Sequence, residues 1–273
     1  MEDINLGAVQ ETALIPLAIR ANETKGKRRI IDRKAAEIIE ALGVDTKPLD
    51  KYGSHEGVVS RTILLDSAVK ELIAQCPDAV CLNLGCGLDD RFSRVDNGRV
   101  RWRNIDLSDM IAFRRRFYAE SDRERMEVRD ILSDGWTDGI PNDREIIAVA
   151  EGLLMYFTKE QIRGLLESLR DAFPDGYLVC ELMHPAMMKE DRHDTIKATK
   201  AKFGWGTESG HDLEALCGDF TLIRETSLSE EMKKYSLINK IAAVIIGNRN
   251  NRVAVFHWRA SAMENKNIGR NGA

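Results

Sequence analysis

Two closely spaced glycines, Gly85 and Gly87, could bind a ligand through the backbone. They follow the apolar run 79–82, and an apolar run that breaks into Gly-x-Gly predicts a buried strand, a tight turn and a helix behind it. Glycine allows a sharp turn and lets a ligand approach where a Cβ would obstruct it. A dinucleotide site would have a third glycine where this chain has Asp90, and Asp89 adds another carboxylate near the place of a diphosphate. The turn therefore favours a cationic or zwitterionic nucleoside.

An acidic residue, Asp106, stands nineteen residues after Gly87, at the end of the strand-like run 100–105. An acid at about this separation, closing the second strand of a β-α-β unit, is placed to accept both hydroxyls of a ribose. Gly-x-Gly alone is a weak signal, because a structural turn in any α/β protein can carry it. Together with Asp106, it favours a nucleoside site over a purely structural turn.

Strands and helices alternate from residue 79 onward, which predicts an α/β fold with a mostly parallel sheet. Strand-like runs cover 79–85, 100–106, 126–132, 145–154, 176–183, 220–228 and 253–258. Helices are expected over 108–118 with Ser108 as its cap, over 158–173 with a capping box from Thr158 to Gln161, and over 230–246.

Residues 1–78 fall outside this alternation and show helical patterns over 12–20, 32–42 and 60–74. Nothing in this region forms a second core of its own. We therefore expect 1–78 to be a helical cap packed over the carboxyl ends of the strands, where open α/β sheets bind ligands. Residues 79–260 would be the ligand-binding core, and the polar residues 261–273 a flexible tail.

Composition limits the partners that the chain is expected to have. The 273 residues suffice for one large domain, 43% are hydrophobic, and the net charge of −4 gives no reason to expect a nucleic acid as partner. No run of 18 apolar residues predicts a membrane span, so no membrane partner is expected either. Five cysteines without a CxxC pair or metal-ligand spacing, and no secretory pattern at the N-terminus, predict a cytoplasmic protein without a bound metal.

Several separated segments of the chain resemble the leucine carboxyl methyltransferase-like family of S-adenosylmethionine (SAM) dependent enzymes. Within it, the chain is most similar to the branch of O-methyltransferases of tetracenomycin-type polyketide synthesis. The segments lie at 11–17, 60–66, 83–92, 104–107, 151–156 and 202–210. Glu-Gly-Leu-Leu-Met-Tyr at 151–156 is fairly specific when it follows a glycine turn. The resemblance covers about residues 8–215.

The resemblance implies a class I methyltransferase sheet of seven strands, the last antiparallel, with SAM as cofactor. SAM carries a sulfonium, a carboxylate and an ammonium group, so its site needs acids and one cation. Arg61 matches the family's arginine that grips the SAM carboxylate, as a bidentate guanidinium would. The resemblance further assigns the methionine part to Gly85, Cys86 and Gly87, the ribose to Asp106, the adenine to Asp130 and Ile131, and the ammonium group or transfer site to Glu151.

Simpler interpretations of these residues remain open at this point. Arg61 could form a surface ion pair with Asp66 or Glu56, and Asp130 could cap a local turn. Glu151 is harder to dismiss, because an acid at the end of the apolar run 146–150 is expensive to bury unless it is paired. Cys86 is interpreted as a small residue that fits the turn rather than as a nucleophile.

The resemblance predicts methyl transfer to an oxygen of a small-molecule acceptor, either a carboxylate or a hydroxyl. Such a transfer mainly needs alignment of donor and acceptor and exclusion of water. A carboxylate acceptor is already ionised, whereas a phenol would benefit from a general base. His184, at the end of a predicted strand, is the best-placed base, ahead of His193 and His211. Tyr156 and Trp205 could line the acceptor pocket, or could equally be packing residues.

Two other functions compete with this hypothesis. A regulatory module that binds SAM or a nucleoside without catalysis would keep the arginine, the glycines and the ribose acid. A nicotinamide-dependent reductase would use the same kind of sheet, but Asp90 in place of the third glycine argues against it.

Overall fold

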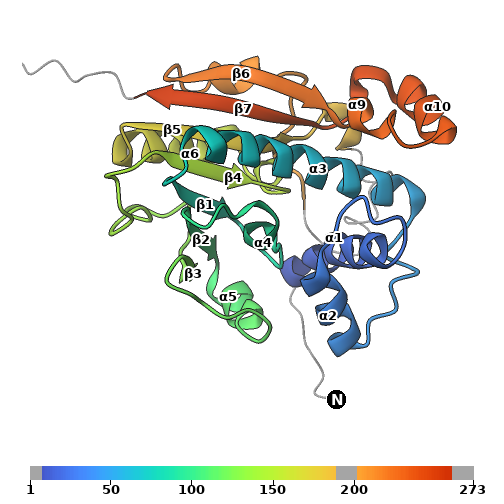
Figure 1. Cartoon of the computed structure of the whole chain (residues 1–273). Coiled ribbons are helices and arrows are strands. Elements are labelled where there is room, and N and C mark those ends of the chain that lie inside the picture. Colours follow the sequence, from blue (N-terminus) through green and yellow to red (C-terminus); the bar gives the residue numbers. More distant parts are fainter. Residues whose placement is uncertain (1–7, 189–201, 260–273) are drawn as a thin grey trace, which may run out of the picture.

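The structure, a computed structural model, describes residues 8–188 and 202–259 and is built on one seven-stranded sheet (Figure 1). The strand order is β3-β2-β1-β4-β5-β7-β6, and β7 runs antiparallel to both of its neighbours while the other pairs are parallel. This confirms the predicted α/β fold with the last strand antiparallel. The strands are β1 Val80–Leu84, β2 Arg101–Asp106, β3 Glu124–Val128, β4 Ile146–Ala150, β5 Asp175–Leu182, β6 Phe220–Ser227 and β7 Arg252–Arg259.

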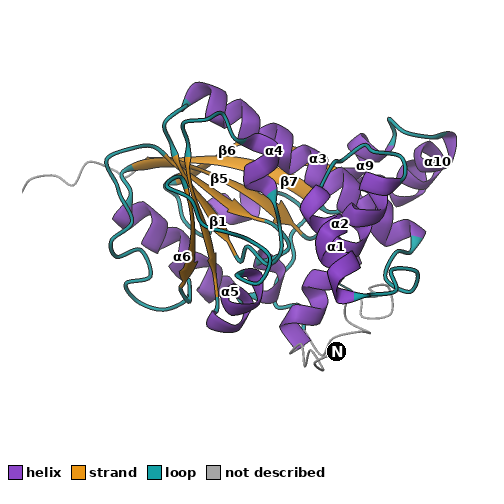
Figure 2. Ribbon diagram, turned by 60° about the horizontal axis from the view of Figure 1, so that its bottom comes forward, coloured by secondary structure: helices purple, strands orange, loops and turns teal. Residues whose placement is uncertain are grey.

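The helices lie on both faces of the sheet and beyond one of its ends (Figures 1 and 2). They are α1 Ala8–Lys25, α2 Arg33–Leu42, α3 Tyr52–Gln75, α4 Arg91–Val95, α5 Ser108–Arg114, α6 Lys159–Ala172, α8 His211–Glu214, α9 Leu228–Met232 and α10 Leu237–Ile246. Short 3-10 turns are η1 Leu154–Tyr156, η2 Pro185–Met187 and η4 Gly247–Arg249. The predicted capping box is present, because Thr158 and Gln161 exchange side-chain and backbone hydrogen bonds at the start of α6.

Several sequence-based boundaries are wrong. The strand expected over 145–154 ends at Ala150, and the helices expected over 12–20 and 60–74 extend over Ala8–Lys25 and Tyr52–Gln75. Strand β3 ends at Val128 rather than at 132, so Asp130 lies in a turn. Ser108 is the first residue of α5 and caps nothing with its side chain, and the helix ends at Arg114. The single helix expected over 230–246 is divided into α9 and α10, because the Ser236 side chain accepts from the backbone N–H of Asn239 and starts a new helix there.

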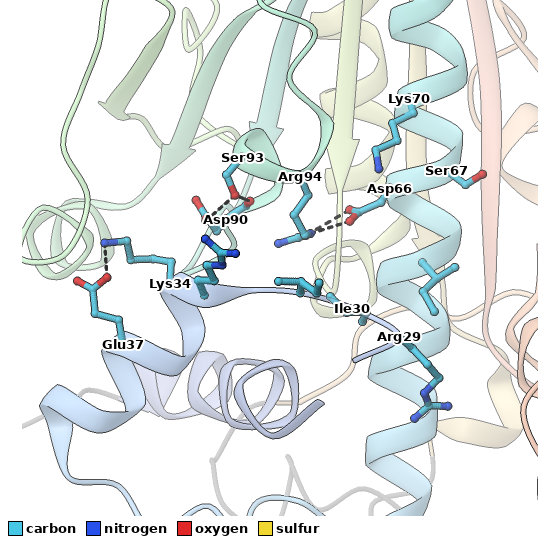
Figure 3. A pocket seen from close by; sticks show the side chains of 13 residues that line it. Arg29, Ile30, Lys34, Glu37, Asp66, Ser67, Lys70, Asp90, Ser93 and Arg94 are labelled. Carbon is cyan, nitrogen blue, oxygen red and sulfur yellow. Dashed lines mark hydrogen bonds and ion pairs between the residues drawn. The ribbon is translucent and has the colours of Figure 1, made fainter. Parts of the chain in front are cut away.

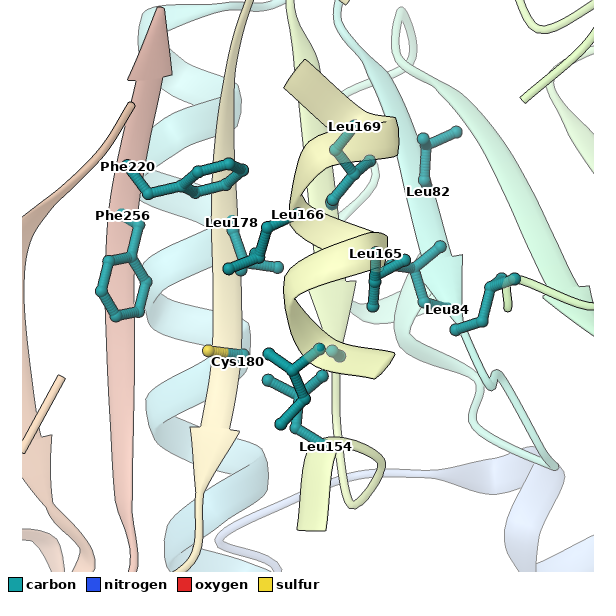
Figure 4. Packing of buried hydrophobic residues seen from close by; sticks show 14 of the residues in the cluster. Leu82, Leu84, Leu154, Leu165, Leu166, Leu169, Leu178, Cys180, Phe220 and Phe256 are labelled. Atoms are coloured by element: carbon teal, nitrogen blue, oxygen red, sulfur yellow. The ribbon is translucent and has the colours of Figure 1, made fainter. Parts of the chain in front are cut away.

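Alternate residues of the central strands supply two separate hydrophobic cores. Leu82 and Leu84 of β1 pack on one face with α6, as Figure 4 shows, whereas Cys81 packs on the other face with α3. Because both faces are covered, β1 and β4 are buried at every position. This explains why their sequences are continuous apolar runs rather than alternating ones.

The N-terminal helices pack in two different places. Leu65, Val69 and Leu72 bury one side of α3 against the sheet itself, in the same core as β1 and β4. Helices α1 and α2 instead pack with Cys86 and Leu88, in the turn and loop that follow β1. They therefore cover the edge at which the parallel strands end (Figure 1). A domain boundary at residue 78 stays a prediction, as does the tail over 261–273, which lies outside the described residues.

Candidate functional site

The turn after β1 requires both of its glycines. Gly85 and Gly87 have φ values of +60° and +49°, in the left-handed region that residues with a Cβ seldom adopt. A Cβ on Gly85 would also lie 2.8 Å from Cδ1 of Leu153, whereas one on Gly87 would meet only Ala13, at 3.8 Å. Cys86 is buried between them, and burial raises the pKa of its thiol to about 12, so it is a poor nucleophile.

Asp106, the last residue of β2, holds this turn in place. One carboxylate oxygen accepts from the backbone N–H of Gly87 and the other from that of Leu107, both at 2.8 Å. Burial raises the pKa of Asp106. An ionised carboxylate offers about four acceptor sites, so two remain for other donors. The carboxylate can therefore fix the glycine turn and accept from a pair of hydroxyls at once.

Arg61, on α3, lies between two acids that follow or belong to neighbouring strands. Its Nε and Nη2 contact Glu151, after β4, at 2.9 and 2.8 Å, and its Nη1 contacts Glu181, on β5, at 2.9 Å. Burial alone would lower the pKa of Arg61, but the charges of Glu181 and Glu151 raise it. The alternative pairing with Asp66 or Glu56 is wrong, because other arginines bind those two acids.

Glu151 is the centre of a larger buried ion network. Besides Arg61, it pairs with Arg91 at 2.5 Å, and Arg20 lies 3.9 Å away. Burial opposes ionisation, but the charges of Arg61 and Arg91 lower the pKa of Glu151 to about 2. The network comprises the guanidinium groups of Arg20, Arg61, Arg91 and Arg94 and the carboxylates of Asp32, Asp66, Asp89, Glu151 and Glu181. Carboxylates outnumber guanidinium groups by one.

Sequence reasoning did not single out five members of this network: Arg20, Asp32, Arg91, Arg94 and Glu181. Glu181 is 2% exposed on β5, and Arg91 is fully buried at the start of α4. The rule that drew attention to Glu151 also applies to Glu181, because an acid within the apolar run 178–183 needs a partner. Asn251, just before β7, donates to Glu181 at 2.9 Å and supplies such a partner besides Arg61.

Near Asp106, a group of exposed apolar side chains surrounds the turn that carries Asp130. Leu107, Val128 and Leu132 are 51%, 52% and 38% exposed, and Val128 pairs with Asp106 across the β2–β3 ladder. The Asp130 carboxylate accepts from the backbone N–H of Leu132 at 3.0 Å, as the turn-capping interpretation expected. Asp130 also lines a cavity of about 530 Å³. An apolar surface beside a carboxylate that still has acceptor sites suits a flat heterocyclic base.

Three residues are candidates for the acceptor side: His184, Tyr156 and Trp205. Nδ1 of His184 accepts from the backbone N–H of Ala186 at 3.0 Å, which places the ring proton on Nε2 and leaves no free lone pair. Burial lowers the pKa of His184. Trp205 is 4% exposed within the core on the α6 face, which favours its role in packing. The Tyr156 ring lies 5.5 Å from that of Phe203, and burial raises the pKa of Tyr156.

The other two candidate bases do not join this group. His211 is exposed and its Nδ1 contacts Glu214 on the same helix, at 2.5 Å. His193 lies outside the described residues.

A cavity of about 790 Å³ adjoins the outer side of the ion network (Figure 3). Asp66 of α3 and Arg94 of α4 form part of its wall, so the cavity touches the network without reaching Glu151. Asp90 lines the same cavity and accepts from the Ser93 hydroxyl at 2.6 Å. The lining mixes cations, acids and isoleucines.

Over 8–188 and 202–259 there is no group of three or more His, Cys, Asp or Glu side chains placed to hold a metal ion. Within the same ranges, no helix has both the length and the apolar composition needed to cross a membrane.

The sequence of this chain is similar to those of known methyltransferases. A model of the family described as leucine carboxyl methyltransferase matches residues 13–170. The tetracenomycin polyketide synthesis O-methyltransferase of Streptomyces glaucescens is 31% identical over 218 residues, covering 78% of this chain and 81% of that protein. A SAM-dependent methyltransferase of Gibberella zeae is 25% identical over 237 residues, covering 77% and 79%.

Solved structures share the fold at low sequence identity. A proposed methyltransferase of Thermobifida fusca superposes with a TM-score of 0.61 at 16% identity, covering 91% of this chain and 94% of that one. The magnesium protoporphyrin IX methyltransferase of Synechocystis, with bound S-adenosylhomocysteine, gives a TM-score of 0.52 at 11% identity, covering 87% and 97%. At these identities, the likeness concerns the fold.

Proposed function

Because this chain belongs to the leucine carboxyl methyltransferase family, we propose that it transfers a methyl group from SAM to an ionised oxygen, foremost a carboxylate, of a small molecule. It is a SAM-dependent methyltransferase, which removes the nicotinamide reductase and the non-catalytic module from consideration. The site residues and the kind of acceptor belong to the proposal.

The buried ion network fits SAM in charge. SAM has a net charge of +1 at neutral pH, from a sulfonium, an ammonium and a carboxylate group, and the network carries one carboxylate in excess. Arg61 has five N–H groups and uses three on Glu151 and Glu181, so two remain for the cofactor carboxylate. Charged donors that are already paired and buried need little reorganisation when a ligand binds.

The remaining contacts of the proposed cofactor site follow the edge of the sheet. Gly85 and Gly87 would face the methionine part, Asp106 the ribose hydroxyls, and Asp130 with Ile131 the adenine. Glu151 would attract the ammonium group, because its lowered pKa keeps it ionised throughout the physiological range. When bound, SAM supplies a methyl group on a sulfonium that departs as a neutral thioether.

The observation that carries the choice of an ionised acceptor is the state of His184. Its Nδ1 lone pair is already used by the Ala186 N–H, so taking a proton would break that hydrogen bond. A carboxylate needs no deprotonation at neutral pH, since its ordinary pKa is near 4. The protein would then hold the acceptor in line with the methyl group and exclude water, which are the main needs of such a transfer. The relative from Streptomyces glaucescens is itself named an O-methyltransferase.

The test is to incubate purified enzyme with SAM labelled in its methyl group and a panel of small carboxylic acids and phenols, then treat the labelled products with alkali. Methyl esters release volatile labelled methanol under alkali, whereas methyl ethers and methylamines retain the label. Alkali-volatile product supports the proposal. Labelled product that is wholly stable to alkali would contradict a carboxylate acceptor.

We also propose a reducing, cytoplasmic location. All five cysteines are free thiols, and four of them are buried. Alkylation of the cysteine thiols in intact cells, with and without prior reduction, would test this location. Thiols that become labelled only after reduction would contradict it.

A further inference from the structure

Helix α10 turns its apolar side away from the protein. Leu237, Ile238, Ile241, Val244 and Ile245 are 73%, 66%, 55%, 73% and 77% exposed. At 100° per residue, these five side chains fall within about 120° of the helix circumference, which makes one continuous stripe. A surface helix ordinarily turns such a stripe toward the core. We call these five residues the α10 stripe.

The inward side of α10 explains this reversed orientation. Asn239 is buried and its amide donates to Oε2 of Glu56, on α3, at 2.7 Å. Ala243, one turn later, is 1% exposed and presents only a methyl group to the protein. A buried amide bonded to a buried carboxylate fixes the rotation of the helix, because turning the stripe inward would leave Glu56 without that donor. The stripe is therefore held outward.

Basic residues flank the stripe along the chain. Lys233, Lys234, Lys240 and Arg249 flank it, and the sequence has no acidic residue between Met232 and Arg249. On α9, Glu230 pairs with Lys233 and Glu231 pairs with Lys234. The helical hairpin formed by α9 and α10 is thus locally positive, although the net charge of the chain is −4. An apolar stripe with a basic rim is typical of helices that lie in the surface of an anionic lipid bilayer.

A second copy of the chain fits the stripe less well. An aliphatic side chain presents on the order of 100 Å², so the five stripe residues present on the order of 350 Å². A stable interface buries about 800 Å² on each partner. Two identical hairpins would also bring their basic rims together, and like charges repel. A lipid bilayer requires no minimum interface area, and an anionic bilayer attracts these cations.

We propose that α10 docks this enzyme on an anionic lipid surface, with the α10 stripe immersed among the lipids. The helix stands beyond the carboxyl ends of the parallel strands, on the same side as α1 and α2 (Figure 1). Asn251, in the same β6–β7 connection, bonds Glu181 of the ion network. Docking would therefore bring the candidate site near the lipid, where apolar acceptors concentrate. The expectation of no membrane partner considered only a span, and a surface helix needs none.

The test is co-sedimentation of the full chain with vesicles of phosphatidylcholine alone, or of phosphatidylcholine and phosphatidylglycerol in equal amounts. We expect the protein to bind the anionic vesicles, to bind the neutral ones less, and to dissociate as salt screens the charges. The double variant I241Q/V244Q should bind at least about tenfold more weakly, since each immersed aliphatic side chain contributes about that factor. The matched control is Ile223→Gln, because Ile223 is 54% exposed on β6 and lies outside the stripe.

Analytical ultracentrifugation of the same proteins tests the alternative that a second copy of the chain covers the α10 stripe. A monomer–dimer equilibrium that I241Q/V244Q abolishes, without vesicle binding by wild type, would assign the stripe to a second copy and overturn the proposal. A monomer that ignores both kinds of vesicle would overturn it as well, as would equal vesicle binding by wild type and I241Q/V244Q. The substituted side chains are exposed, so melting temperature and SAM affinity should stay unchanged and verify that the variant folds. The result does not depend on which acceptor the enzyme methylates.

Discussion

Replacing Arg61 by lysine keeps the positive charge of the proposed cofactor site but removes the planar fork of N–H groups. The guanidinium now contacts Glu151 through Nε and Nη2 and Glu181 through Nη1, at 2.8–2.9 Å. A lysine ammonium has three N–H groups rather than five. After meeting both carboxylates, it would retain one donor for the SAM carboxylate where arginine retains two.

The expected loss of affinity follows from that one hydrogen bond. A hydrogen bond to a charged group contributes about 1.5–3 kcal/mol, and 1.4 kcal/mol is about a factor of ten. Arg61→Lys should therefore weaken SAM and S-adenosylhomocysteine about 10- to 150-fold. Both ligands share the carboxylate, so both should weaken by the same factor.

Titration calorimetry at 25 °C would give the two dissociation constants, and circular dichroism would show that the variant is folded at that temperature. The matched control is Arg125→Lys, because Arg125 lies on β3 with half of its side chain exposed, and its ion-pair partner Asp122 is 3.9 Å away. That variant should bind both ligands as wild type does. A folded Arg61→Lys variant with dissociation constants within threefold of wild type would refute the assignment of Arg61 to the carboxylate.

Four further outcomes are expected. Asp106→Ala should weaken SAM binding at least about tenfold by calorimetry, because it removes acceptors for the Gly87 N–H and for the ribose hydroxyls. An unchanged affinity would refute the assignment of the ribose to Asp106. His184→Ala should lower the rate by less than the 10²–10⁴-fold typical of losing a general base, with a nearly flat rate between about pH 6.5 and 9; a larger loss, with a rate rising through about pH 6.5, would favour a hydroxyl acceptor. The lowered pKa of Glu151 adds stability that is complete above about pH 4.5 and lost as the pH falls toward about 2, so urea midpoints should drop over that interval; a flat profile there would contradict the buried ion network. Gly176→Ala should lower the melting temperature, because its Cβ would lie 2.4 Å from the Trp258 ring, whereas Gly164→Ala, on open helix surface, should raise it slightly; equal shifts would contradict the packing.

The sequence by itself determined the elements whose signals are local. A run of apolar residues needs burial on both faces, so β1 and β4 could be predicted without knowing their neighbours. The glycine turn and Asp106 could be paired from spacing alone, because a β-α-β unit fixes the distance between the ends of its two strands. The Thr158 capping box was equally predictable, since all of its hydrogen bonds lie within one helical turn.

Only the tertiary structure decided which charged groups meet. Arg61 was assigned two possible partners near it in sequence, yet it pairs with Glu151 and Glu181, which are 90 and 120 residues away. Such pairs form because parallel strands bring their carboxyl ends to one edge of the sheet, and chain separation says nothing about which side chains converge there. The orientation of α10 is likewise decided by a contact between residues far apart in the sequence. Periodicity shows that its aliphatic residues share one side, but the hydrogen bond between Asn239 and Glu56, 183 residues apart, turns that side outward.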